Sequence, residues 1–219
     1  MYFTPAQESF APLPLQPPGV VIDDTMGQMG VSLHFDRDEE IYGQAEGADL
    51  IYRVVKGAVR TSRLMSDGRR QIGDFYYPGD VFGVEPEQEH VFSAEALCDS
   101  VVLLLKRSAV RDAAKGQFDR LIWAAASREL RRAQDHVLLL GRKTACERVA
   151  TFLMSVLNRS PGSGAHLPMG RQDMADYLGL TIETVSRMLT QLQASDVIEF
   201  IGLREFQVRN RQSLARLAE

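Results

Sequence analysis

The sequence predicts an α+β protein: an N-terminal antiparallel β-roll of the jelly-roll kind, one long helix, and a C-terminal winged helix-turn-helix. Three observations predict this class. Short apolar alternations separated by glycine run from about Ser32 to Leu105, which is the spacing of strands in a roll or barrel. A helical apolar stripe follows Lys106. Two further helical patterns with a glycine turn between them lie near the C-terminus.

We expect four units along the 219 residues. Five of the nine prolines lie in the first 18 residues, and each removes a helical hydrogen bond, so this segment is expected to be a loose arm. The predicted units are the arm (1–22), the β-roll (23–115), the long helix (116–141) and the winged helix-turn-helix (142–219).

The charge of the chain changes sign along its length. Residues 1–140 carry 15 basic and 21 acidic side chains, whereas residues 141–219 carry 10 basic and 8 acidic ones. A phosphate-bearing partner is therefore expected at the C-terminal end.

Cysteine and apolar content indicate where the protein works. Cys98 and Cys146 are the only cysteines and have no metal-ligand spacing, so we expect neither a disulfide framework nor a metal site. No apolar run is long enough to span a bilayer or to act as an export signal. We expect a protein of the reducing cytoplasm with no membrane partner.

Strands of the roll are expected at Leu50–Val55, Ala58–Thr61 and Ile72–Tyr76. Asp67-Gly68 between the last two is the best hairpin turn, because glycine accepts the positive φ that such turns require.

The long helix carries a narrow apolar stripe. From Gln117 to Leu140 there is no glycine or proline, and apolar residues recur at alternating spacings of three and four, the a and d positions of a heptad. The stripe can lie on the chain's own domain or form a seam between two copies, and we favour the seam. Its residues are Trp123, Ala126, Leu130, Ala133, Val137 and Leu140.

Residues 170–194 contain two helical patterns with a turn between them. Gly179 ends the first pattern, where a left-handed residue is usually needed, and Thr181 is placed to cap the second. This is the pattern of a helix-turn-helix. The residues expected to face inward are Met174, Ala175, Leu178, Val185, Met188, Leu189 and Leu192.

Three side chains share the exposed face at the start of the second helix: Glu183, Ser186 and Arg187. In a major groove of double-stranded DNA, Arg187 can donate two bonds to guanine and Glu183 can accept one from cytosine. Ser186 is short enough to suit a neighbouring base edge. Further DNA contacts, mostly to phosphate, are expected from Gln172, Thr181, Ile182, Thr184 and Thr190.

A salt bridge is the simpler explanation of Glu183 and Arg187, because they are also an i,i+4 pair. The segment that follows argues against it. Residues 197–201 and 204–208 are two short strand-like segments separated by Gly202-Leu203. This arrangement predicts the β-hairpin wing of a winged helix. Arg204 in this wing is either a phosphate contact or a solvated turn residue.

The chain resembles the Crp/Fnr superfamily of bacterial transcription regulators, and within it the FixK-like branch, over about residues 32–210. Leu178 to Arg187 carries its Glu-x-x-Ser-Arg signature. The resemblance implies that Glu183, Ser186 and Arg187 read the TTGA ends of a TTGA-N6-TCAA palindrome. It also implies a roll like the jelly roll of cyclic-nucleotide-binding domains, and a dimerisation helix at the Trp123 to Leu140 stripe.

By this resemblance the protein is a homodimeric activator without bound cofactor. Its genes would serve microaerobic or anaerobic metabolism or nitrogen fixation. RNA polymerase would be a second partner, and the exposed loop Ser66-Asp67-Gly68-Arg69-Arg70 is a candidate contact.

The residues present argue against two kinds of cofactor found in the family. Val84 follows Gly83, and Phe92 precedes Ser93-Ala94, so the glutamate and arginine of cyclic-nucleotide binders are missing and a buried phosphate would lack its cation. Residues 1–40 contain no cysteine for an iron–sulfur cluster.

Ligand gating through haem is the main alternative, with His34 or His90 as ligand, although each is expected to be a surface or hydrogen-bonded residue. Cys146 could be a redox handle, but inert packing is favoured for both cysteines. The acidic clusters at 36–40 and 85–89 lack a nucleophile or phosphate loop, so we expect no enzyme.

Overall fold

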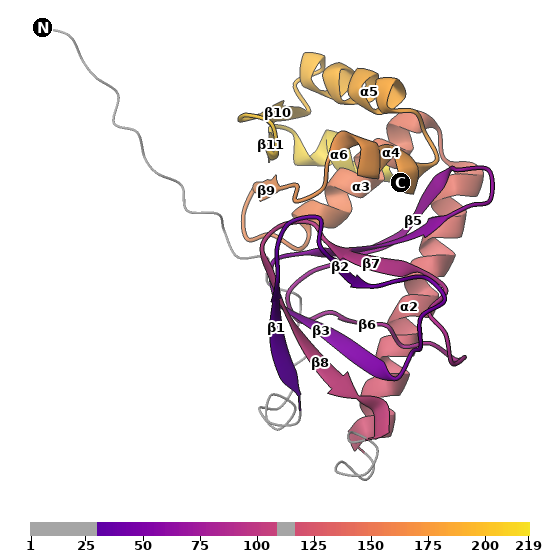
Figure 1. The fold of residues 1–219 in the computed structure, drawn as a ribbon. Helices are drawn as coiled ribbons and strands as arrows, with labels where there is room; N and C mark the ends of the chain where they lie inside the picture. The colour runs from indigo at the N-terminus through magenta and orange to yellow at the C-terminus, as the bar shows by residue number, and fades with distance from the viewer. Residues whose placement is uncertain (1–29, 109–116) are drawn as a thin grey trace, which may run out of the picture.

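The computed structural model describes residues 30–108 and 117–219, and the predicted arm (1–22) lies outside the described residues. In Figure 1 the roll forms the lower part of the molecule and the C-terminal helices the upper part, and one long helix runs beside both. Within the described ranges no helix is long and apolar enough to cross a membrane.

The roll consists of two four-stranded antiparallel sheets, as the alternating pattern predicted. One sheet has the order β1-β8-β3-β6, from Val31–Phe35, Ser100–Lys106, Leu50–Lys56 and Val81–Phe82. The other has the order β2-β7-β4-β5, from Glu40–Tyr42, Ser93–Ala96, Val59–Leu64 and Arg70–Tyr76.

The turn between β4 and β5 forms at Asp67-Gly68 as predicted. Gly68 has φ 84°, and its amide donates to the carbonyl of Met65 at 2.9 Å. The expectation of an evenly exposed loop is wrong for Arg70. Its side chain is only 28% exposed because it pairs with carboxylates of α4 (Arg171–Leu178), whereas that of Arg69 is 82% exposed.

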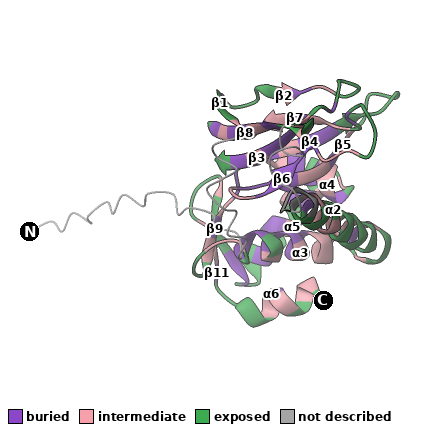
Figure 2. Cartoon of the chain, turned by 90° about the horizontal axis from the view of Figure 1, so that it is seen from below, coloured by how far each residue is buried: buried purple, intermediate pink, exposed green. Residues whose placement is uncertain are grey.

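Helix α2 (Gln117–Arg142) leaves the predicted seam stripe facing outward. Trp123, Leu130 and Val137 are 76%, 61% and 69% exposed, and Figure 2 shows α2 exposed along much of its length. The helix packs on its own chain through Ala125 and Leu139, which are buried. Leu140, the last predicted residue of the stripe, is the exception, because it is half-buried and packs on the C-terminal core. The rest of the stripe does not lie on the chain's own domain.

The C-terminal unit is a winged helix-turn-helix with two elements that were not predicted. Strand β9 pairs with β11 to complete a three-stranded wing sheet, and α6 packs on α3. Its elements are α3 (Ala145–Leu157), β9 (Gly164–His166), α4 (Arg171–Leu178), α5 (Ile182–Ala194), β10 (Ile198–Phe200), β11 (Glu205–Val208) and α6 (Arg211–Ala218).

The core of this unit is continuous with one face of the roll. Leu153, Met174 and Leu178 are fully buried, and the same cluster includes Phe75 and Leu97 from the roll. Because apolar burial is the main stabilising term in folding, the two units are held together by a shared core.

Candidate nucleic-acid interface

The turn between α4 and α5 has the geometry that the sequence predicted. Gly179 adopts the left-handed conformation, with φ 61° and ψ 40°, and the amide of Leu180 returns to the carbonyl of Ala175 at 3.0 Å. The Thr181 hydroxyl accepts from the amide of Thr184 and so caps α5. The start of α5 is thereby fixed relative to α4.

Burial divides α5 into an inner and an outer face. Val185, Leu189 and Leu192 are buried, and Ala175 on α4 is completely buried where the two helices pack. On the opposite face Glu183 and Arg187 are exposed, and Ser186 is half-buried between them. The three predicted base-reading side chains therefore share one outward face.

Glu183 and Arg187 do not form the i,i+4 salt bridge that was the simpler explanation. No ion pair links them among the described residues. Hydrogen bonds from its own amide and from Thr181 lower the pKa of the Glu183 carboxyl, so it is ionised at neutral pH. Both charges remain available to a partner in front of α5.

The remaining predicted contacts on α5 lie around these three. The Thr184 hydroxyl lies 3.2 Å from that of Thr181, and the exposed Thr190 donates to the carbonyl of Ser186 at 2.9 Å. Ile182 is 36% exposed at the start of the helix. Phosphate contact by these residues stays a prediction, as it does for Gln172.

Two predicted residues have partners within the protein. Gln172 on α4 donates to the Asp176 carboxylate at 2.7 Å and remains exposed. Arg204 is half-buried and donates to the carbonyl of Pro168 at 2.5 Å, so it braces the base of the wing and is not a solvated turn residue.

The tip of the wing carries apolar side chains that sequence reasoning missed. Ile201 and Leu203 are 51% and 92% exposed on either side of Gly202, which has φ 96°. The apolar residues around Gly202 are the sequence signal for this exposed tip. At the level of sequence they were used only to predict a hairpin.

The two candidate haem ligands occupy different environments. His34 is exposed, with Nδ1 3.8 Å from the Asp36 carboxylate. His90 is neither at the surface nor hydrogen-bonded, contrary to expectation. It is 2% exposed, its ring nitrogens have no hydrogen-bond partner among the described residues, and its ring stacks on Tyr42. Coordination of a haem iron by His90 would require the roll to open around the ring, because both ring nitrogens are buried.

The structure also bears on the two cysteines. Cys146 is half-buried at the start of α3, and burial, with a smaller effect of Glu147, raises the pKa of its thiol. Because the thiolate is the reactive form, this environment disfavours redox chemistry. The Cys98 sulfur lies 3.9 Å from the Ser100 hydroxyl. Among the described residues no cluster of three or more His, Cys, Asp or Glu side chains is placed to hold a metal.

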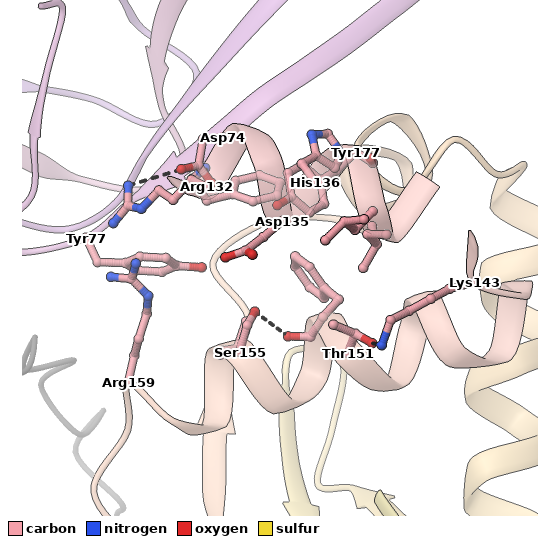
Figure 3. Close-up of a pocket in the computed structure, with 15 residues that line it drawn as sticks. Asp74, Tyr77, Arg132, Asp135, His136, Lys143, Thr151, Ser155, Arg159 and Tyr177 are labelled. Atoms are coloured by element: carbon pink, nitrogen blue, oxygen red, sulfur yellow. Dashed lines mark hydrogen bonds and ion pairs between the residues drawn. The ribbon is translucent and has the colours of Figure 1, made fainter. Parts of the chain in front are cut away.

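A cavity of about 390 Å³ lies where the roll meets α2, α3 and α4, and Figure 3 shows Asp135 and Tyr77 facing into it. Aromatic walls come from Phe75, Phe152 and Tyr177. Sequence reasoning did not anticipate it, because its lining comes from segments that are far apart in the chain.

Comparison with known families matches both halves of the chain. Residues 32–117 match the cyclic nucleotide-binding domain, and residues 147–217 match the Crp-like helix-turn-helix domain.

Individual relatives are similar over most of their length. The nitrogen fixation regulation protein FixK of Azorhizobium caulinodans is 43% identical over 91% of this chain and 86% of its own. FixK of Rhizobium meliloti is 41% identical over 81% and 82%. The solved structure of FixK2 from Bradyrhizobium japonicum is 51% identical, covers 87% of this chain and 98% of its own, and gives a TM-score of 0.83.

A β-roll joined by a long helix to a winged helix-turn-helix with an outward recognition helix defines a DNA-binding transcription regulator. The chain belongs to the Crp/Fnr family, among the transcription activators of the FixK and Fnr type.

Proposed function

We propose that this protein is a homodimeric activator that reads TTGA-N6-TCAA palindromes with α5 and works without a bound cofactor. The observation that carries the proposal is the pair Glu183 and Arg187, exposed and unpaired with each other on the first turns of a capped helix. An arginine that donates to guanine and a glutamate that accepts from cytosine together specify a G·C pair.

Dimerisation is supported by the exposed stripe on α2. Trp123, Leu130 and Val137 are large, apolar and mostly exposed at heptad spacing, and apolar patches of this kind mark interaction surfaces. Two chains joined along α2 would present two α5 helices to successive major-groove turns about 34 Å apart. A twofold protein would then read a twofold operator.

The regulated genes are inferred from the relatives. The Azorhizobium and Rhizobium proteins are both named as regulators of nitrogen fixation, so we propose genes of nitrogen fixation or of microaerobic and anaerobic metabolism, controlled in the cytoplasm. In the β4–β5 loop, Arg69 is the exposed basic residue that we propose contacts RNA polymerase.

A ligand-gated regulator of the same fold is the second candidate. The cavity between the roll and the C-terminal helices favours it, because its lining includes Tyr177 of α4 and residues of β5, α2 and α3. For haem, an absorbance spectrum of the freshly purified protein separates the candidates. A Soret band in stoichiometric amount would contradict the cofactor-free proposal.

The proposal is tested by titrating the protein with a TTGA-N6-TCAA duplex and with a duplex of equal length whose half-sites are scrambled, both at one stated salt concentration. We expect specific binding at least about 10³-fold tighter than binding to the scrambled duplex. Equal affinity for both duplexes would contradict sequence-specific binding.

A further inference from the structure

Two arginines of the roll bind the first helix of the helix-turn-helix. Arg60 on β4 donates from Nη1 to both carboxylate oxygens of Asp173, at 3.1 and 3.2 Å. Arg70 on β5 donates from Nη2 to Asp173 at 2.7 Å and from Nε to Asp176 at 2.8 Å. We call these four residues the α4 clamp.

Asp173 is held on its other side by its own helix. Its carboxylate accepts from the amide of Gly170 at 3.1 Å, and its side chain is only 9% exposed. Gln71 adds a bond from its side-chain amide to the carbonyl of Asp176 at 3.0 Å. α4 is therefore fixed to the roll at Asp173 and Asp176 by charge-assisted hydrogen bonds, which are short and directional.

The C-terminal end of α4 is also fixed to α2, through His136, and to α3, through Arg148. The His136 ring stacks on that of Tyr177, with centroids 4.2 Å apart, and its Nε2 lies 2.7 Å from the Tyr177 carbonyl. Arg148 donates to the carbonyl of Leu178 at 2.9 Å. Figure 3 shows His136 and Tyr177 beside each other at the cavity wall.

Both ends of α4 are thus restrained while α5 is free on its outer side. α5 follows α4 through the left-handed turn at Gly179, so any rotation of α4 against the roll rotates α5 as well. In a dimer joined along α2, such a rotation would change the distance between the two recognition helices.

We propose that the α4 clamp sets the spacing between half-sites that the dimer accepts. Its members are positioning residues, because they lie between the roll and α4 and act on DNA only through α5. Inserting one base pair moves a half-site by about 3.4 Å along the axis and by about a tenth of a turn. With α4 restrained, the dimer would bind such an operator weakly. With α4 released, α5 could reorient and the dimer would bind it.

Buried ion pairs support this role because separating the two partners leaves a buried charge uncompensated, which is strongly destabilising. The clamp carboxylates of Asp173 and Asp176 are 9% and 14% exposed, so a rotated α4 would leave buried charges without partners. The ion pairs thereby restrict the orientation of α4, and with it that of α5, without contacting a base.

The proposal rests on the proposed function and is tested with three duplexes in which the same half-sites are separated by five, six or seven base pairs. The variant is Arg70→Gln with Asp176→Asn, which removes both charges of one pair together. Arg63→Gln is the matched control, because Arg63 is an exposed arginine on the same strand as Arg60. A duplex with a single half-site measures base reading alone.

We expect wild type and Arg63→Gln to prefer six base pairs by about tenfold or more, and the double variant to bind all three duplexes within about threefold. Its affinity for the single half-site should be unchanged. An undiminished preference in the folded double variant would overturn the proposal. If the wild-type protein shows no spacing preference, the result contradicts the proposed palindrome-reading dimer, on which the clamp proposal rests.

A variant that fails to fold, as judged by circular dichroism, is replaced by Arg70→Lys, which keeps the charge but loses the two-pronged geometry. It should show an intermediate spacing preference. A wild-type preference in Arg70→Lys would count against the clamp.

Discussion

The imidazole ring of His90 lies parallel to the phenol ring of Tyr42 inside the roll, with ring centroids 3.7 Å apart and planes 16° apart. Neither ring nitrogen has a hydrogen-bond partner among the described residues. Burial lowers the pKa of His90, and the nearby Glu85 carboxylate opposes this only in part. The roll thus contains a histidine that is most stable in its neutral form.

This environment predicts that acid destabilises the roll. The unfolded chain takes up a proton near pH 6.5, whereas folded His90 does so only at lower pH, so the unfolded state binds more protons in between and stability falls as the pH falls through that window. Urea unfolding at pH 7.5 and 5.5 measures the loss. We expect a smaller loss in His90→Phe, and the same loss in both proteins would contradict the assignment.

Gly57 and Gly68 have the same left-handed backbone conformation, but we expect alanine to lower the free energy of unfolding by different amounts at the two positions. A Cβ at Gly68 (φ 84°) meets nothing within 4 Å, whereas a Cβ at Gly57 (φ 87°) would overlap the Ser100 hydroxyl and lie 2.8 Å from the Asp99 carbonyl. Gly68→Ala should cost about 1–2 kcal/mol from the backbone alone. Gly57→Ala should cost about 1–3 kcal/mol more, measured by chemical unfolding, and equal costs would refute the crowding at Gly57.

The α2 seam predicts that a charge at its centre separates the protomers. Leu130 is 61% exposed in the single chain, and Leu130→Glu would place two carboxylates in the seam, where desolvation costs several kcal/mol per ion. We expect sedimentation to show monomer for Leu130→Glu and dimer for Gln134→Glu, which adds the same charge off the stripe. A dimer in both variants would show that another surface joins the chains.

Features that depend on local chemistry were predictable from the sequence. Gly179 and Thr181 end one helix and start the next by rules of backbone conformation and capping, and both have that geometry. Asp67-Gly68 forms its hairpin for the same kind of reason.

Features that depend on a distant partner were not predictable. The sequence predicts an exposed loop at Arg70, but the partners of Arg70 lie more than a hundred residues away on α4. His90 is buried beside Tyr42 and Tyr52, which lie far from it in the sequence, and its sequence neighbours do not show this. β9 is only three residues long, too short for a periodic signal, and becomes a strand because β11 pairs with it.

The most direct test of the central claim combines Arg187→Ala with a replacement of the half-site G·C pair by A·T, in titrations at one salt concentration. If Arg187 reads that guanine, each single change should cost about 1–3 kcal/mol, and the base change should cost little once the arginine is gone. Arg63→Ala, which removes an exposed arginine of the roll, should retain the full guanine preference. A cost of Arg187→Ala that is the same on both duplexes would contradict base reading by α5.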